Sequence, residues 1–171
     1  MVNTDYFRQL AQYNAWANWR LYGACARLDD AERRKPRPCF FGSIHATLNH
    51  ILVADRTCLA RLTGAEHGIV NLDHELYADF EELRAARVTE DERLICLVGS
   101  YDEAELADTL CYVSTEGEVK RKPMAQVLGH LFNHQTHHRG QVHALLSDTG
   151  VPPPPPLDLS YLLWAGSAAR R

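Results

Sequence analysis

The segment "PMAQVLGHLFNHQTHHRGQVHALLS", residues 123–147, has the pattern of one long amphipathic helix. Pro123 suits its first turn, where a missing N–H has no intrahelical partner to lose, and the prolines at 152–156 forbid any continuation. On a helical wheel with about 100° per residue, His134 and His138 fall within an apolar stripe. The other members of that stripe are Val127, Leu131, Val142 and Leu145. The segment therefore predicts a core-forming helix that directs two histidines inward.

Three other segments repeat apolar residues at steps of three and four, as helices with one buried face do. They cover residues 5–28, 43–64 and 76–101. Asn3 or Thr4 is expected to cap the first helix and Gly64 to end the second, whereas Arg87 and Glu90 interrupt the apolar seam of the third. Four such helices bury their apolar faces most simply against one another, so the sequence predicts an all-α protein, an antiparallel four-helix bundle.

Shorter elements are expected beside the bundle. Residues 109–123 alternate in polarity around a central glycine, which predicts a short β-hairpin before the last long helix. Ser100 and Glu103 have the spacing of a capping box, which indicates a short helical restart ahead of that hairpin. Residues 157–166 are apolar enough for a short C-terminal helix, which we expect to follow a stiff proline connector.

Composition limits the classes of protein that fit. The chain has 171 residues, 46% of them hydrophobic, which suits a single domain over residues 1–171. Lys and Arg number 18 against 22 Asp and Glu, and the basic runs at 33–37 and 120–122 are interpreted as solvated loops, so nucleic-acid binding is not expected. There is no run of about 18 apolar residues, and the five cysteines form no CxxC pair. We therefore expect a cytoplasmic protein that does not bind membranes.

The histidines of the last helix differ in direction. His134 and His138 are four residues apart on the inward face, a spacing that lets both imidazoles reach one metal ion. His130 and His137 fall to one side of the stripe, and His143 falls nearly opposite it. An inward histidine without an ion is an ordinary hydrogen-bonded core residue, so the spacing alone leaves both interpretations open.

A metal ion would need a third protein ligand, and the second helix offers His45 and His50. They lie on different flanks of its apolar stripe, so periodicity does not choose between them. The turns on either side of His50 carry Ala46, Thr47 and Ala54, small side chains that would leave room for a ligand and a solvent molecule. The remaining histidines, His67 and His74, lie in a polar connection and are given no role.

Several motifs together resemble the DinB family and the wider group of DinB and YfiT-like metalloenzymes. They are "YNAWANWRL" at 13–21, "LNHIL" at 48–52, H-x-x-x-H-R-G-Q at 134–141, the "EG" hairpin, and an ending with Pro156, Asp158, Leu159 and Tyr161. The resemblance extends over nearly the whole chain, and the H-x-x-x-H-R-G-Q block is its most specific part.

This resemblance implies a four-helix bundle, usually a homodimer, in which His50, His134 and His138 bind a divalent metal ion. Zinc or nickel is the first candidate and iron a further one, because three neutral imidazoles suit these ions. The implied activity is that of a metal-dependent hydrolase, or of a transferase or isomerase that uses a low-molecular-weight thiol, acting on a small molecule. The alternative is a non-catalytic stress-response or interaction protein in which the ion braces two helices.

Five further residues are close to the expected site. Gln141 either orients a ligand or is an ordinary amide on the flank of the helix. Arg139 faces away from the two histidines on the wheel, which favours a salt bridge or an interface. Trp16 and Trp19 are interpreted as packing residues, and Asp55 as a carboxylate in an exposed turn.

Overall fold

The computed structural model describes residues 3–65, 69, 71–114, 117–151 and 155–162. The helices of this part are α1 (Thr4–Cys25), α2 (Asp30–Arg34), α3 (Ile44–Thr63), α4 (Phe80–Ser100), α5 (Glu103–Ala107) and α6 (Met124–Leu146). The strands are β1 (Thr109–Val113) and β2 (Val119–Pro123), which pair antiparallel. Residues 159–162 are also helical, as expected for the C-terminal segment, whose remainder from 163 onward lies outside the described residues.

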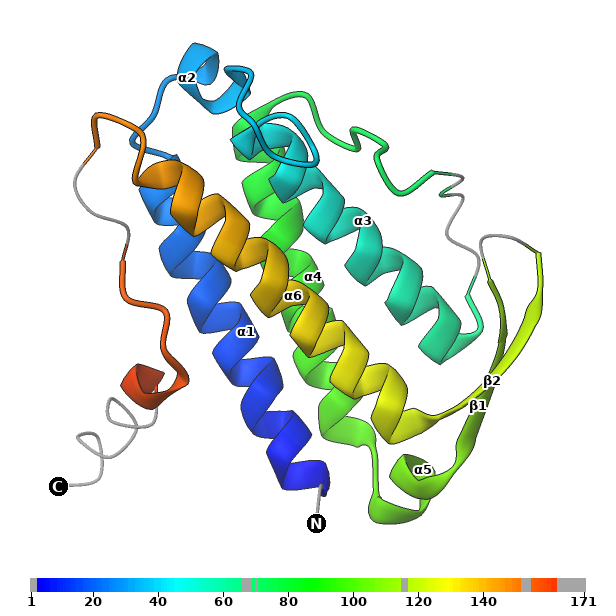
Figure 1. Cartoon of the computed structure of the whole chain (residues 1–171). Coiled ribbons are helices and arrows are strands. Elements are labelled where there is room, and N and C mark those ends of the chain that lie inside the picture. The colour runs from blue at the N-terminus through cyan, green and yellow to red at the C-terminus, as the bar shows by residue number, and fades with distance from the viewer. Residues whose placement is uncertain (1–2, 66–68, 70, 115–116, 152–154, 163–171) are drawn as a thin grey trace, which may run out of the picture.

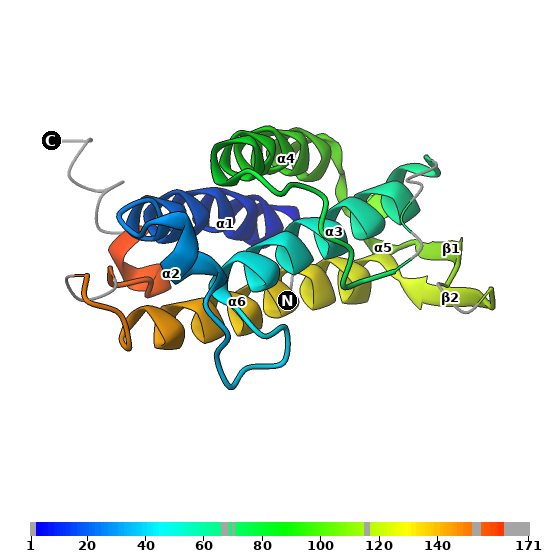
Figure 2. The same cartoon turned by 90° about the horizontal axis from the view of Figure 1, so that it is seen from above.

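The helices α1, α3, α4 and α6 pack side by side as a four-helix bundle (Figure 1). The helices α1 and α6 run in one direction and α3 and α4 in the other, because the connection after α3 returns the chain to the end where α3 began. Each helix therefore has a parallel and an antiparallel neighbour. The hairpin lies against the end of the bundle where α3 ends and α6 begins (Figure 2). The expected all-α bundle with a hairpin before its last long helix is confirmed.

Local signals explain the helix ends. The side chain of Asn3 caps α1 by accepting a hydrogen bond from the Tyr6 N–H, and Gly64 ends α3 with a positive φ of 71°. The capping box of α5 uses Asp102 and Glu105, so the expected pair of Ser100 and Glu103 is wrong by two residues. The helix α2 was not expected, although Asp29 caps it.

The bundle interior has two apolar clusters, one toward each end, with polar residues buried between them. One cluster includes Phe7, Leu59, Leu94 and Leu128, and the other includes Leu21, Leu48, Leu83 and Val142. A set of buried polar side chains, here called the polar layer, separates the clusters on all four long helices. Its members are Asn14, Asn18, Asp55, Arg87, Asp91, Gln135 and Arg139.

The polar layer closes into a ring of hydrogen bonds and ion pairs. The Arg87 guanidinium pairs with two carboxylates, with that of Asp55 at 2.6 Å and with that of Asp91 at 3.0 Å. Asp91 also accepts a hydrogen bond from the side-chain amide of Asn18 at 2.9 Å. Arg139 donates to the oxygens of Asn18 at 3.3 Å and Gln135 at 3.2 Å, and the Gln135 amide donates to Asp55. The ring thus holds two carboxylates and two guanidinium groups, of which Arg87 pairs directly with both carboxylates and Arg139 is hydrogen-bonded to neutral amides.

This ring corrects two expectations and sets the orientation of α6. Asp55 is fully buried rather than in an exposed turn, and Arg139 binds neutral amides inside the bundle rather than a salt-bridge partner. Gln135 and Arg139 each directly follow one of the inward histidines. Because their side chains are fixed in the ring, α6 cannot rotate without breaking it, and the preceding histidines are held toward α3. No helix within the described residues is long and apolar enough to span a membrane.

Candidate metal centre

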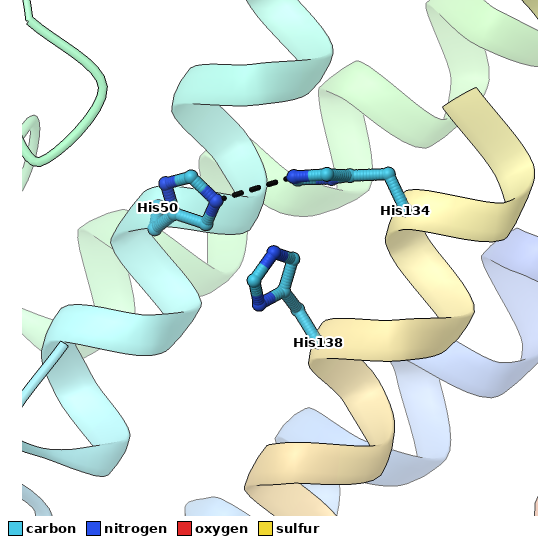
Figure 3. A group of neighbouring side chains, drawn as sticks. All are labelled: His50, His134 and His138. Atoms are coloured by element: carbon cyan, nitrogen blue, oxygen red, sulfur yellow. Dashed lines mark hydrogen bonds between the residues drawn. The ribbon is translucent and has the colours of Figure 1, made fainter. Parts of the chain in front are cut away.

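Three histidines from two antiparallel helices converge on one point (Figure 3). His50 comes from α3, and His134 and His138 come from successive turns of α6. One ring nitrogen of each lies within 4.8 Å of the others, and the Nε2 atoms of His50 and His134 are 3.3 Å apart. In the described part of the chain, no other histidine, cysteine or carboxylate belongs to this group.

The spacing between two of the three nitrogens matches that of a tetrahedral metal site. Two imidazole nitrogens bound at about 2.0–2.1 Å to one tetrahedral zinc lie about 3.4 Å from each other. The observed 3.3 Å between His50 and His134 corresponds to one edge of such a tetrahedron. The residues therefore fit a divalent ion held by three protein ligands, and a tetrahedral ion so held keeps one position for a small molecule.

Hydrogen bonds fix the tautomers of two rings. The Nδ1 of His50 lies 2.7 Å from the carbonyl oxygen of Leu72, and the Nδ1 of His138 lies 2.8 Å from Oε1 of Gln141. Both partners are acceptors, so each Nδ1 carries the proton and donates it. The Nε2 lone pairs of both rings then remain free to bind an ion, and the outer partners hold the rings in place.

The surroundings keep the three imidazoles neutral. Burial, followed by repulsion from the charged forms of His138 and His50, lowers the pKa of His134 to about 3. Burial is also the main cause that lowers the pKa of His50 and of His138 below the ordinary histidine value. All three are thus in the metal-binding form at neutral pH.

The other histidines of the described chain take different places. His45 is buried, but its Nε2 lies 2.9 Å from the carbonyl oxygen of Tyr77, which makes it a hydrogen-bonded core residue. His137 lies 3.2 Å from the Gln141 amide and His143 lies 3.1 Å from the Pro155 carbonyl oxygen. His67 lies outside the described residues, and His74 is exposed.

An aromatic residue that sequence reasoning missed covers one side of the histidines. The ring of Phe41 stacks on His50 with 3.9 Å between centroids and meets His138 edge-on at 5.5 Å. Phe41 lies in the irregular segment before α3, where no helical or strand periodicity assigns a direction to a side chain. The only sequence signal was the pair of phenylalanines just ahead of the Ser43 cap.

A cavity of about 550 Å³ adjoins His50 and His134 and extends toward the hairpin. This volume is within the range of small-molecule sites. Cys58 lines it, but burial raises the pKa of this thiol to about 12, so it stays protonated and is a poor nucleophile. Neither tryptophan of α1 lines the cavity, and Trp19 is 66% exposed.

Comparisons with known proteins give the family and the fold. Residues 1–170 match the model of the DinB family. The Protein DinB of Bacillus subtilis (strain 168) is 23% identical over 153 residues, which cover 86% of this chain and 88% of that protein. A crystal structure of a DinB-like protein from Bacillus cereus superposes with a TM-score of 0.68 at 18% identity, covering 89% of this chain and 96% of the other. The fold is thus shared with a solved DinB-like protein, and the chain belongs to the DinB family.

Proposed function

We propose that His50, His134 and His138 bind one divalent metal ion and that the protein is a metal-dependent enzyme acting on a small molecule. The observation that carries this proposal is the convergence of three neutral imidazoles, without a fourth candidate ligand among the described residues, beside a cavity of about 550 Å³. Three protein ligands and an accessible remaining position are typical of catalytic rather than structural zinc sites.

The bound ion, with zinc or nickel as the first candidates and iron as a further one, would supply a Lewis acid that lowers the pKa of water or of a thiol. Leu72 and Gln141 keep the His50 and His138 rings oriented for binding. Cys58, the cysteine that lines the cavity, stays protonated, so the proposed reacting thiol is that of a low-molecular-weight substrate. The proposed activities are accordingly a hydrolase and a thiol-dependent transferase or isomerase.

A purely bracing role for the ion is less well supported. The helices α3 and α6 are already joined through Asp55 and Gln135 in the polar layer, close to the histidines in sequence. A brace also needs no cavity at the ion. X-ray absorption of the zinc-loaded protein is expected to give three nitrogen ligands from histidine plus exchangeable light atoms. A closed shell of four protein ligands would favour the bracing role.

Elemental analysis of untagged protein tests the site. We expect about one ion per chain in the wild type and less than about a tenth of that in His50→Ala, His134→Ala and His138→Ala, because removing one of three ligands leaves too few. His143→Ala is the matched control, since this histidine lies on the same helix and outside the group, with its Nε2 against the Pro155 carbonyl oxygen. Full metal content in the three site variants, with helical circular dichroism retained, would contradict the proposal.

We also propose that the protein acts in the cytoplasm as a homodimer. Analytical ultracentrifugation of the metal-loaded chain tests the oligomeric state, for which a species of twice 19.3 kDa is expected.

A further inference from the structure

The end of the cavity remote from His50 and His134 is lined by basic side chains. Arg61 comes from the last turn of α3, and Lys120 and Lys122 come from β2. Among the described residues that line the cavity there is no aspartate or glutamate. This local excess of positive charge contrasts with the net charge of −4 of the whole chain.

The hairpin places its charges by strand alternation. Lys120 and Lys122 line the cavity, whereas Arg121 between them does not, because successive residues of a strand point to opposite faces. On β1 the cavity-lining residue Tyr112 is paired directly with Lys120. The basic run 120–122, which the sequence suggested is a solvated loop, therefore forms part of a strand that directs two lysines into the cavity wall.

Two of these cations are available for a ligand. The Arg61 guanidinium lies over the Tyr112 ring, 4.9 Å from its centroid, and its buried Nε has no hydrogen-bond partner within the described chain. Lys122 likewise has no ion pair with any described residue, whereas Lys120 is paired with Glu118. Arg61 also forms no ion pair with any described residue, and a guanidinium or ammonium group without a counter-charge can donate charge-assisted hydrogen bonds to an anionic ligand.

We propose that this end of the cavity binds the anionic group, a carboxylate or a phosphate, of an elongated small-molecule substrate. Arg61 follows His50 by eleven residues (61 − 50), which is about 16 Å along the axis of α3. The Arg61 side chain leans back toward the start of the helix and shortens this gap. The inference depends on the proposed function only in placing the reacting end of the substrate at the histidines.

Three six-carbon probes that differ at one end test the inference: hexanoate, hexyl phosphate and 1-hexanol. Each is titrated into metal-loaded and metal-depleted protein at low salt, with the hairpin amide signals followed by NMR. At least one anionic probe is expected to bind about tenfold more tightly than hexanol, as one charge-assisted contact gives. Which of the two binds better identifies the group as carboxylate or phosphate.

Charge-removing variants locate the contact. Arg61→Gln and Lys122→Gln should each reduce the anionic preference to within about threefold, and Arg121→Gln should leave it unchanged because it removes the same charge from the opposite face of the same strand. Lys122 is exposed, so its variant keeps the test decisive if the Arg61 variant folds poorly.

The outcomes separate this inference from the proposed function. Equal binding of hexanol and both anions, or an anionic preference that survives in Arg61→Gln and Lys122→Gln alike, would overturn the anion site whether or not metal binds. A protein that holds no metal but keeps an anionic preference sensitive to these variants would support the anion site and contradict the metal-dependent activity.

Discussion

Gln141 shows how one side chain outside the histidine group can control it. Its Oε1 accepts a hydrogen bond from the His138 Nδ1–H, with 2.8 Å between nitrogen and oxygen, so Gln141→Met should leave that ring without its orienting partner. Loss of such a partner lowers metal affinity about 10- to 100-fold. Competition with a chromophoric chelator measures the affinity, and Gln126→Met on the same helix is the control. An affinity within about twofold of the wild type would show that Gln141 is an ordinary flank amide.

Asp55 is the residue whose loss should most disturb the polar layer. Asp55→Ala removes the acceptor shared by Arg87 and Gln135 and leaves part of a buried guanidinium charge uncompensated. Breaking a buried ion pair in this way costs about 3–5 kcal/mol of unfolding free energy. Asp30→Ala, which removes exposed ion pairs with Arg33 and Arg34, should cost less than about 1 kcal/mol. Urea denaturation of both variants gives the comparison, and equal costs would contradict it.

At the residue scale, helical periodicity predicted direction but not partners. The wheel placed His134 and His138 inward, and both take part in the histidine group. It could not separate His45 from His50, because that choice depends on the carbonyl oxygens of Tyr77 and Leu72, more than twenty residues further along the chain. Those carbonyls lie in irregular segments whose course no periodic pattern encodes.

At the scale of the elements, two glycines provide opposite predictions. Gly64 ends α3 with φ 71°, a conformation that costs an alanine about 1 kcal/mol, so Gly64→Ala should destabilise the protein by that amount. Gly23 lies inside α1 with open space around its Cα, so Gly23→Ala should stabilise by about 0.5–1 kcal/mol. Thermal denaturation checks both signs, and a Gly64→Ala protein as stable as the wild type would argue against the left-handed end of α3.

The long helices were predictable because each carries a periodic apolar stripe and clear end signals, such as the Ser43 cap and Gly64. The polar positions within the stripes were misread. Arg87 was interpreted as a break in the apolar stripe of its helix, yet it forms ion pairs with Asp55 and Asp91 inside the bundle. A single helix shows only that a stripe is broken, since the compensating partner lies on another helix.

For the molecule as a whole, the histidines and the buried carboxylates respond to acid in opposite directions. His134 has its pKa lowered to about 3, so below the ordinary histidine pKa of about 6.5 the unfolded chain binds a proton that the folded chain does not. His50 and His138 act in the same direction, and the stability of the metal-free protein falls as the pH drops. Burial raises the pKa of Asp55 to about 6, above its ordinary value in the unfolded chain. As the pH falls from about 6 to 4, the folded protein therefore binds this proton before the unfolded chain does, and stability rises.

These signs give a prediction for metal-free protein measured by urea denaturation at about pH 7.5, 6.5 and 5.5. Four histidines of the described chain, His45 among them, have a lowered pKa, and they outnumber the two carboxylates whose pKa burial raises, Asp55 and Asp91. Wild-type stability should therefore decrease toward acid pH, by at most about 1.4 kcal/mol per pH unit for each histidine and less where solvent screens it. His134→Gln should flatten this dependence, and Asp55→Asn should steepen it. Bound metal should add stability that diminishes as the pH falls, because protons compete for the same imidazole nitrogens. Parallel pH curves for wild type and both variants would mean that neither group couples its ionisation to folding.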